Sequence, residues 1–202
     1  IGHGFVGKAT EYLFDRFYPG TDIQIHDPDQ GKEIEDWKGI QYAFICVPTN
    51  LKGNKLDTSI IDKVLKGLSE RSCAGECVPV IRSTIGPDQA LQYVKKYGAI
   101  IMPEFLREKH WQQDVDDLKN PILIGCHNCN DFIDMMKENK IDATERYMRR
   151  IAIKRILVTS PAEASAIKLF RNAALAVNVE MANLVNNACD VYGLKYDKIK
   201  SY

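Results

Sequence analysis

Two kinds of stretch alternate along the chain. Short apolar runs are followed by amphipathic stretches with helical periodicity. Continuous apolar runs are typical of strands buried on both faces of a parallel sheet, and their alternation with helices predicts a doubly wound, Rossmann-type α/β fold. The predicted strands cover residues 22–27, 42–48, 77–83, 99–103, 121–125 and 154–160. One predicted helix follows a glycine-rich turn at residues 2–7. Other predicted helices cover residues 58–71, 87–98 and 130–140.

A longer helical pattern lies near the end of the chain. It runs from about Pro161 to Tyr192, and Gly193 ends it. Its first half is mostly small and apolar, yet it contains Lys168 and Asn172, which project from one helix face because they are four residues apart. We therefore expect a parallel-sheet Rossmann domain over residues 1–160, followed by the start of a central helical domain over residues 161–202.

Composition and charge narrow the classes of partner. The 202 residues are 45% hydrophobic, and 27 basic side chains balance 27 acidic ones. A formal net charge of zero gives no electrostatic reason to expect nucleic acid or a membrane surface as a partner. No apolar run approaches the ~20 residues that span a bilayer.

Six cysteines are too sparse in a chain of this length for a disulfide scaffold. We interpret them as free thiols in a reducing cytoplasm. A zinc site is the alternative, formed by the pairs Cys73/Cys77 and Cys126/Cys129. The first pair has C-x-x-x-C spacing and both lie at the edges of predicted strands, so loop cysteines without a metal are favoured.

The glycine-rich turn matches the G-x-G-x-x-G pattern through Gly2, Gly4 and Gly7. The first glycine permits the tight turn, the second allows a pyrophosphate to approach, and the third lets the helix pack close to a strand. Asp27 ends the next predicted strand, where a carboxylate binds the adenosine ribose and disfavours the extra phosphate of NADP. We expect NAD as the cofactor; a glycine turn followed by a solvated aspartate is the alternative.

Only Ile1 precedes this turn. A Rossmann sheet has its first strand at the centre, so we expect the protein to have further residues upstream.

Several motifs, in order along nearly the whole chain, resemble those of the UDP-glucose/GDP-mannose dehydrogenase family. They are GHGFVG (2–7), FICVPT (44–49), RSTIGP (82–87), PEFLRE (103–108), NPILIG (120–125) and the helix with Lys168 and Asn172. The resemblance implies NAD-dependent oxidation of the C6 alcohol of a nucleotide sugar, such as UDP-glucose, to the carboxylate.

The resemblance also implies roles for individual residues. In the glycine turn, the cofactor would contact Gly2, Gly4, Phe5, Val6 and Gly7, with Asp27 at the ribose. The walls of the nicotinamide and pyrophosphate pocket would be Val47, Pro48, Thr49, Ser83 and Thr84.

For catalysis, Thr84 and Glu104 resemble the pair that positions and activates a water molecule. A carboxylate can serve there as a general base; for Glu104 the alternative is a helix-start carboxylate after Pro103. The substrate loop would include Phe105, Leu106 and Arg107, although Arg107 could instead pair with Asp114, Asp116 or Asp117.

The lysine and asparagine of the long helix would face the reacting carbon. Lys168 would stabilise developing oxyanion charge or carry the alcohol proton, and Asn172 would hydrogen-bond the oxygen. A lysine that keeps its charged end in water, beside a neutral polar residue, is the alternative. In the family the long helix packs at a dimer interface, which implies a homodimer.

One part of the family's machinery does not occur in this sequence. The four-electron oxidation needs a cysteine in a loop of the form G-G-x-C-x-P-K-D, and none of the six cysteines has these neighbours. We therefore expect the chain to be an incomplete NAD-binding portion. Two alternatives are a non-catalytic NAD-binding module and a β-hydroxyacid dehydrogenase, which needs no cysteine but lacks the PEFLRE motif.

Overall fold

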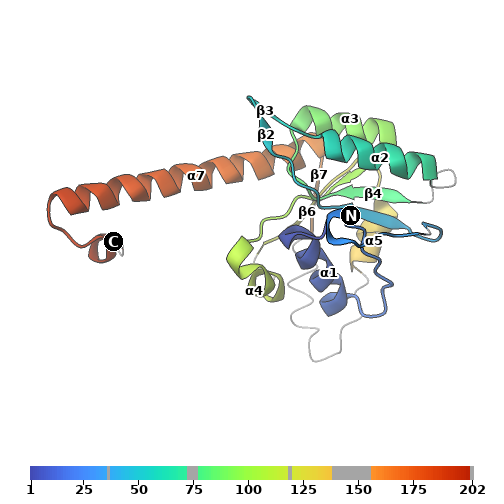
Figure 1. The fold of residues 1–202 in the computed structure, drawn as a ribbon, viewed down its shortest axis with the longest axis horizontal. Helices are drawn as coiled ribbons and strands as arrows, with labels where there is room; N and C mark the ends of the chain where they lie inside the picture. Colours follow the sequence, from blue (N-terminus) through green and yellow to red (C-terminus); the bar gives the residue numbers. More distant parts are fainter. Residues whose placement is uncertain (36, 72–76, 118–119, 138–155, 201–202) are drawn as a thin grey trace.

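The computed structural model describes residues 1–35, 37–71, 77–117, 120–137 and 156–200. A five-stranded sheet in the order β1-β4-β5-β6-β7 forms its centre. Helices cover both faces of this sheet (Figure 1). The strands are Tyr42–Ile45 (β1), Val78–Ile81 (β4), Ile100–Ile101 (β5), Ile122–Gly125 (β6) and Ile156–Thr159 (β7). Five of the six predicted strands are therefore present, and the α/β fold class with a mostly parallel sheet is confirmed.

The helices follow the predicted periodicity. The predicted ones are Phe5–Phe17 (α1), Ser59–Arg71 (α2), Pro87–Tyr97 (α3), Asn130–Lys137 (α5) and Pro161–Val191 (α7). The end of the predicted helix at 138–140 lies outside the described residues. Elements that the pattern did not predict are short: Leu51–Lys52 (β2), Lys55–Leu56 (β3), Trp111–Asp116 (α4), Tyr196–Ile199 (α8) and the 3₁₀ turns Pro28–Gln30 and Glu108–His110.

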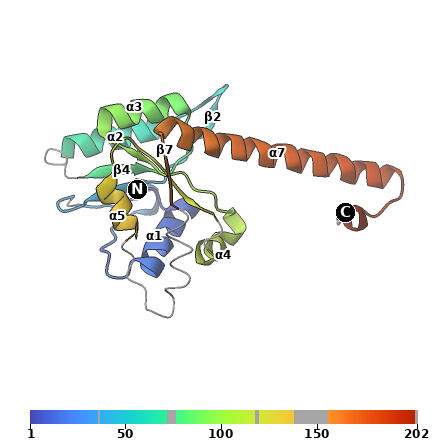
Figure 2. The ribbon, with the colours of Figure 1, turned by 180° about the vertical axis from the view of Figure 1, so that it is seen from behind.

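Two apolar layers hold the helices to the sheet. Alternate residues of each strand point to opposite faces, so Ile81 packs with α2 and α3 while its neighbour Val80 packs with α1 and α5. The first layer is centred on Ile61 and Leu65 of α2, which are at most 1% exposed. Figure 2 shows from behind the helices that these layers hold to the two faces of the sheet.

Residues 22–27 do not form the predicted strand. Within the described residues, the backbone hydrogen bonds of this segment run from Gly2 N to His26 O at 2.9 Å, across a bridge between Asp27 and Lys32, and from Gln30 N to Asp27 O at 3.0 Å. A strand requires a continuous ladder of hydrogen bonds to a neighbour. The segment has no such ladder, so the prediction is wrong for these residues.

One strand pair departs from the predicted parallel arrangement. Ile101 of β5 pairs with Gly125 of β6 in the antiparallel direction, whereas β1/β4, β4/β5 and β6/β7 are parallel. The apolar pattern could not reveal this, because a strand buried on both faces has the same composition in either direction.

The reversal determines the path of α7. The carboxyl end of β7 lies at the opposite edge of the sheet from the carboxyl ends of β1, β4 and β5, so α7 crosses the sheet to reach them. At the crossing, Gly125 is needed because an added Cβ would lie 2.6 Å from the Ala164 side chain. Ser165 of α7 then donates a hydrogen bond to the Ile85 carbonyl at 2.5 Å.

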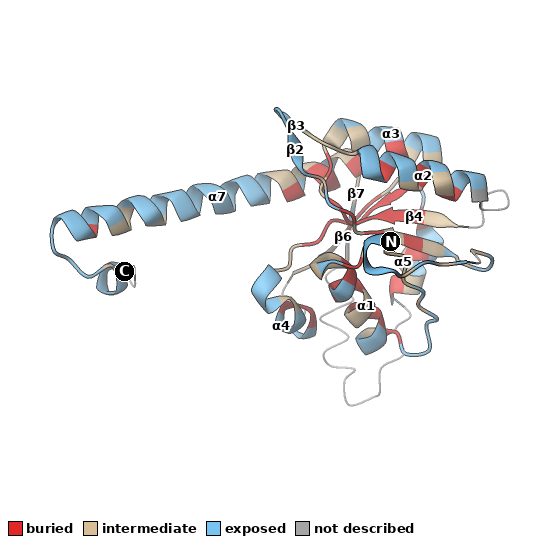
Figure 3. Cartoon of the chain, in the orientation of Figure 1, coloured by how far each residue is buried: buried red, intermediate tan, exposed pale blue. Residues whose placement is uncertain are grey.

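Beyond this crossing, α7 projects away from the α/β body, and its far half is exposed (Figure 3). Among the described residues, no helix is both long enough and apolar enough to traverse a bilayer.

The structure corrects one expectation about the cysteines. Cys126 and Cys129 form a disulfide in the loop before α5, so this pair is not the pair of free thiols that the sequence suggested. Cys46, Cys77 and Cys189 are free, and Cys73 lies outside the described residues. The two cysteines are three residues apart in the sequence, and their Cα atoms lie 6.2 Å apart.

Candidate cofactor and catalytic site

The glycine turn is shaped by two close backbone approaches. Gly2 has φ +79°, and an added Cβ would lie 2.9 Å from the Cys46 carbonyl oxygen. An added Cβ on Gly7 would overlap the carbonyl oxygen of Gly2. Gly4, in contrast, has no atom within 4 Å of the position of an added Cβ. The first and third glycines are therefore required by packing, and the second faces open space.

The amino end of α1 begins at this open position. Gly4 is the N-cap, no side chain caps the helix, and its first turn contains no acidic residue. The first N–H groups of a helix have no intrahelical partner, and the helix dipole makes this end favourable for an anion. The first turn of α1 therefore fits a pyrophosphate.

Asp27 and the glycine turn are in direct contact. Asp27 Oδ2 accepts hydrogen bonds from the His3 backbone N–H at 2.6 Å and from Gln30 Nε2 at 2.9 Å. The carboxylate is half-buried and fixes the position of the turn. Within the described residues, its Oδ1 atom accepts no hydrogen bond and is available to a ribose hydroxyl.

His3 is a supporting residue that the motif did not identify. Its side chain is buried between Glu11 and Lys32, with 2.7 Å from Nε2 to Glu11 Oε2 and 3.0 Å from Nδ1 to Lys32 Nζ. Because the lysine donates to Nδ1, the ring proton lies on Nε2 and is donated to Glu11. The ring thus links the turn to α1 and to the segment after Asp27, a contact that spacing alone does not show.

The predicted pocket walls lie at the carboxyl ends of β1 and β4. Ser83 Oγ donates to the Val47 carbonyl at 2.6 Å and also contacts the Ile45 carbonyl at 3.3 Å. This side chain therefore joins the two strand ends. Thr49 and Thr84 are half-buried and Pro48 is exposed. In open α/β sheets, ligands bind in the crevice outside the carboxyl ends of the strands, which is where these residues lie.

Glu104 and Lys168 form a buried ion pair, although 64 residues separate them in the sequence. Lys168 Nζ donates to Glu104 Oε1 at 2.8 Å and to the Glu104 backbone carbonyl at 2.6 Å. The other carboxylate oxygen accepts the Leu106 backbone N–H at 2.6 Å. Both side chains are 8% exposed. The interpretation of Lys168 as a lysine with its charged end in water is therefore wrong.

Asn172 and Arg107 are placed differently from Lys168. Asn172 is exposed on α7, one turn beyond the ion pair. Arg107 forms a fork with Asp114, with 2.5 Å from Nη2 to Oδ1 and 3.0 Å from Nε to Oδ2. Asp114 is the buried one of the three aspartates considered as partners, with 3% of its surface exposed. The bond to Asp114 raises the pKa of the Arg107 guanidinium.

Phe105, which was predicted to belong to the substrate loop, lies next to two cations of α7. Its ring centroid is 5.6 Å from Lys168 Nζ and 4.7 Å from the guanidinium carbon of Arg171. Asn120 donates to the Phe105 carbonyl at 3.0 Å and accepts from Arg171 at 2.8 Å. The loop after β5 is therefore attached to α7 and to the start of β6.

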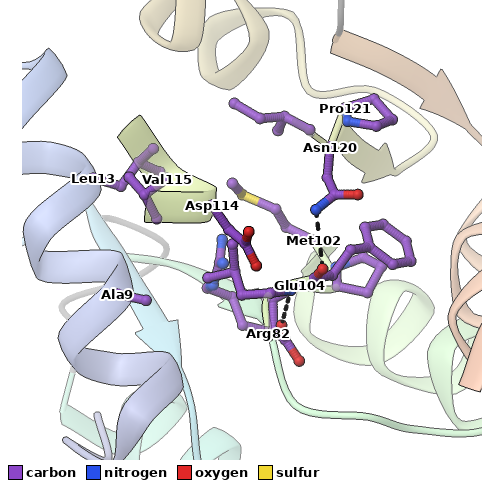
Figure 4. A pocket seen from close by; sticks show the side chains of 13 residues that line it. Ala9, Leu13, Arg82, Met102, Glu104, Asp114, Val115, Asn120 and Pro121 are labelled. Atoms are coloured by element: carbon purple, nitrogen blue, oxygen red, sulfur yellow. Dashed lines mark hydrogen bonds between the residues drawn. The ribbon is translucent and has the colours of Figure 1, made fainter. Parts of the chain in front are cut away.

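A small cavity of about 60 Å³ lies behind Glu104, between this loop, α1 and α4. Figure 4 shows Arg82, Glu104 and Asp114 around it, with Ala9 and Leu13 of α1 on one side. Arg82 was not among the predicted site residues. Arg82 begins the RSTIGP motif, but the motif does not show that it is buried, because its burial depends on elements that lie far apart in the chain.

Comparisons with known proteins identify a relative of the chain. The UDP-N-acetyl-D-mannosamine dehydrogenase of Pyrococcus horikoshii is 25% identical over 171 residues, which are 83% of this chain and 40% of that protein. The chain resembles nucleotide-sugar dehydrogenases. The resemblance expected from the motifs is thus confirmed, whereas no model of a protein family matches the sequence.

Solved nucleotide-sugar dehydrogenases share the fold. A GDP-mannose dehydrogenase from Pseudomonas aeruginosa matches 99% of this chain with a TM-score of 0.65 at 21% identity. A UDP-D-ManNAc dehydrogenase from Pyrococcus horikoshii matches 98% with a TM-score of 0.65 at 20% identity. The chain spans 54% and 55% of these two structures, about half the length of a nucleotide-sugar dehydrogenase.

Proposed function

We propose that the chain is the cofactor-binding portion of an NAD-dependent dehydrogenase that oxidises the C6 alcohol of a nucleotide sugar to the uronate. The observation that carries this proposal is the buried ion pair between Lys168 and Glu104. This ion pair joins α7 to the loop after β5. It lies at the edge of the sheet where the carboxyl ends of β1 and β4 and the uncapped amino end of α1 also lie.

The residues of the glycine turn fit NAD. Gly4 leaves space for the pyrophosphate beside the first N–H groups of α1. Asp27 Oδ1 would accept a ribose hydroxyl, and the carboxylate would repel the 2′-phosphate of NADP. When bound, NAD supplies the acceptor for the hydride that leaves the carbinol carbon.

The ion pair supplies two further chemical groups. Lys168 would donate to the substrate oxygen as negative charge develops there, and this interaction is strong because the site excludes water. Glu104 would accept a proton from the attacking water in the hydrolytic step, with Thr84 positioning that water. Asn172 would be a second hydrogen-bond donor to the same oxygen. It is exposed here, so this role needs further elements of a longer protein to cover α7.

Acid formation also requires a nucleophilic thiolate to trap the aldehyde. None of the six cysteines has the neighbours of a Gly-rich cysteine loop. We therefore expect this chain alone to bind NAD but not to form acid steadily. Steady NADH production from NAD and UDP-glucose by this chain alone would refute that expectation.

Substrate class, assembly and location belong to the same proposal. The relatives' names favour a nucleotide sugar, whether UDP-glucose, UDP-N-acetylmannosamine or GDP-mannose. The exposed apolar side chains of α7, with Phe170 74% and Leu184 68% exposed, fit a homodimer formed through this helix. A cytoplasmic location is part of the proposal because Cys46, Cys77 and Cys189 are free thiols, as is usual in a reducing compartment.

The test is titration calorimetry with NAD and with NADP on the chain and on its Asp27→Ala variant. We expect NAD to bind more tightly than NADP, and the variant to lose about tenfold in NAD affinity while keeping its fold. Equal affinity of the chain and the variant for NAD would contradict the proposed ribose contact. In a parallel survey, binding of hydroxy acids in place of UDP- or GDP-sugars would favour the β-hydroxyacid dehydrogenase reading.

A further inference from the structure

Arg82 is a buried cation to which the proposed function assigns no role. It follows β4 directly, is 6% exposed and lines the cavity behind Glu104 (Figure 4). Its Nε atom is the buried side-chain nitrogen without a hydrogen-bond partner among the described residues. A buried guanidinium is expensive unless anionic groups compensate it, so its surroundings indicate what it compensates.

Two groups near Arg82, Cys46 and Glu104, act on the charge of its guanidinium. Burial lowers the pKa of its guanidinium, whereas the Cys46 sulfur and the Glu104 carboxylate oppose that effect. Cys46 already contacts Thr10 Oγ1 at 3.6 Å. Asp114, the other carboxylate of the cavity, is held by Arg107. Glu104 is paired with Lys168, but it lines the same cavity as Arg82 and is the carboxylate that acts on its guanidinium.

Glu104 will need a second cation during the proposed reaction. Both hydrogen bonds of Lys168 go to Glu104 in this structure. If Lys168 turns to the substrate oxygen, Glu104 keeps the Leu106 N–H but loses its ion-pair partner. Arg171 is engaged with Asn120 and the Phe105 ring. A buried carboxylate without a cation would take up a proton and could no longer act as a base.

We propose that Arg82 is a positioning residue for Glu104, the counter-charge that keeps this carboxylate ionised and in place when Lys168 engages the substrate. This inference rests on the proposed function for the role of Glu104 as a base. Arg82 and Glu104 line the same cavity of the folded chain, so their electrostatic interaction can be measured without substrate.

The test follows the Glu104 carboxyl group by NMR in chain labelled with ¹³C-glutamate, with the signal assigned by Glu104→Gln. Arg82→Met is compared with Arg82→Lys, which retains the charge, after circular dichroism shows that each variant is folded. We expect Arg82→Met to raise the titration midpoint of Glu104 by about one pH unit, and Arg82→Lys to leave it close to wild type. An unchanged midpoint in a folded Arg82→Met variant would overturn the proposal.

A second variant keeps the proposal testable if Arg82→Met does not fold. In Lys168→Met, Arg82 is the cation left beside Glu104, so Glu104 should still titrate well below neutral pH. A midpoint of about pH 8, as for buried carboxyls without a partner, would overturn the proposal. Failure of the proposed function appears separately, as absent NAD binding by a chain whose Glu104 titrates as expected.

Discussion

Replacing Lys168 with methionine should destabilise the folded chain by about 3–5 kcal/mol, because it leaves the Glu104 carboxylate buried without its ion-pair partner. Methionine is chosen because it fills most of the volume of the lysine stem, so the cost reports the lost charge and hydrogen bonds. The change removes two hydrogen bonds, at 2.6 and 2.8 Å.

The magnitude follows from the burial of the pair. Both side chains are 8% exposed, so solvent screens their interaction far less than that of a surface pair, whose contribution is about 0–1 kcal/mol. Hydrogen bonds to charged groups contribute about 1.5–3 kcal/mol each. If Arg82 compensates Glu104 as proposed, the cost lies at the low end of the range.

The assay is urea unfolding of wild type, Lys168→Met, Glu104→Gln and the double variant, followed by circular dichroism. Removing both charges leaves no unpaired ion, so the double variant should be more stable than the sum of the single changes predicts, by about 2 kcal/mol. The control is Lys66→Met, whose lysine forms an exposed pair with Glu70 on α2 and should change stability by less than about 0.5 kcal/mol. Additive single changes, or a Lys168→Met cost no larger than the control, would refute the reasoning.

Three further predictions concern the turn, the start of α7 and the disulfide. Gly7→Ala should lower the melting temperature by several degrees, because the new methyl group overlaps the Gly2 carbonyl, whereas Gly4→Ala should keep the fold and weaken NAD binding. The Thr159 hydroxyl, followed by Ser160, lowers the pKa of Glu163 to about 2 from 4.5. Protection of the first turn of α7 from hydrogen exchange should therefore be present above pH 4.5 and fall as the pH drops toward 2, and Glu163→Gln should remove that dependence. Reduction of the disulfide before α5 should free two more alkylatable thiols, countable by intact mass; an unchanged count would contradict the disulfide.

Much of the framework is a local property of the sequence. Apolar runs such as residues 42–48 identify strands because burial on both faces requires continuous apolar side chains. The glycine spacing identifies the turn because two of its positions, Gly2 and Gly7, cannot accommodate a Cβ against neighbouring backbone. The i, i+4 spacing placed Lys168 and Asn172 on one face of α7, and this followed from helix geometry alone.

Other features depended on contacts between distant segments. The sequence could not show that β6 runs opposite to β5, or that α7 consequently crosses the sheet and brings Lys168 to Glu104. Contacts between distant segments also determine that Arg107 pairs with Asp114 and that Arg82 is buried. Periodicity along one element records which face is apolar, but it carries no information about which charged side chains of other elements meet that face. The ion pair on which the proposed chemistry rests was thus predicted as two separate residues, and only the tertiary structure joined them.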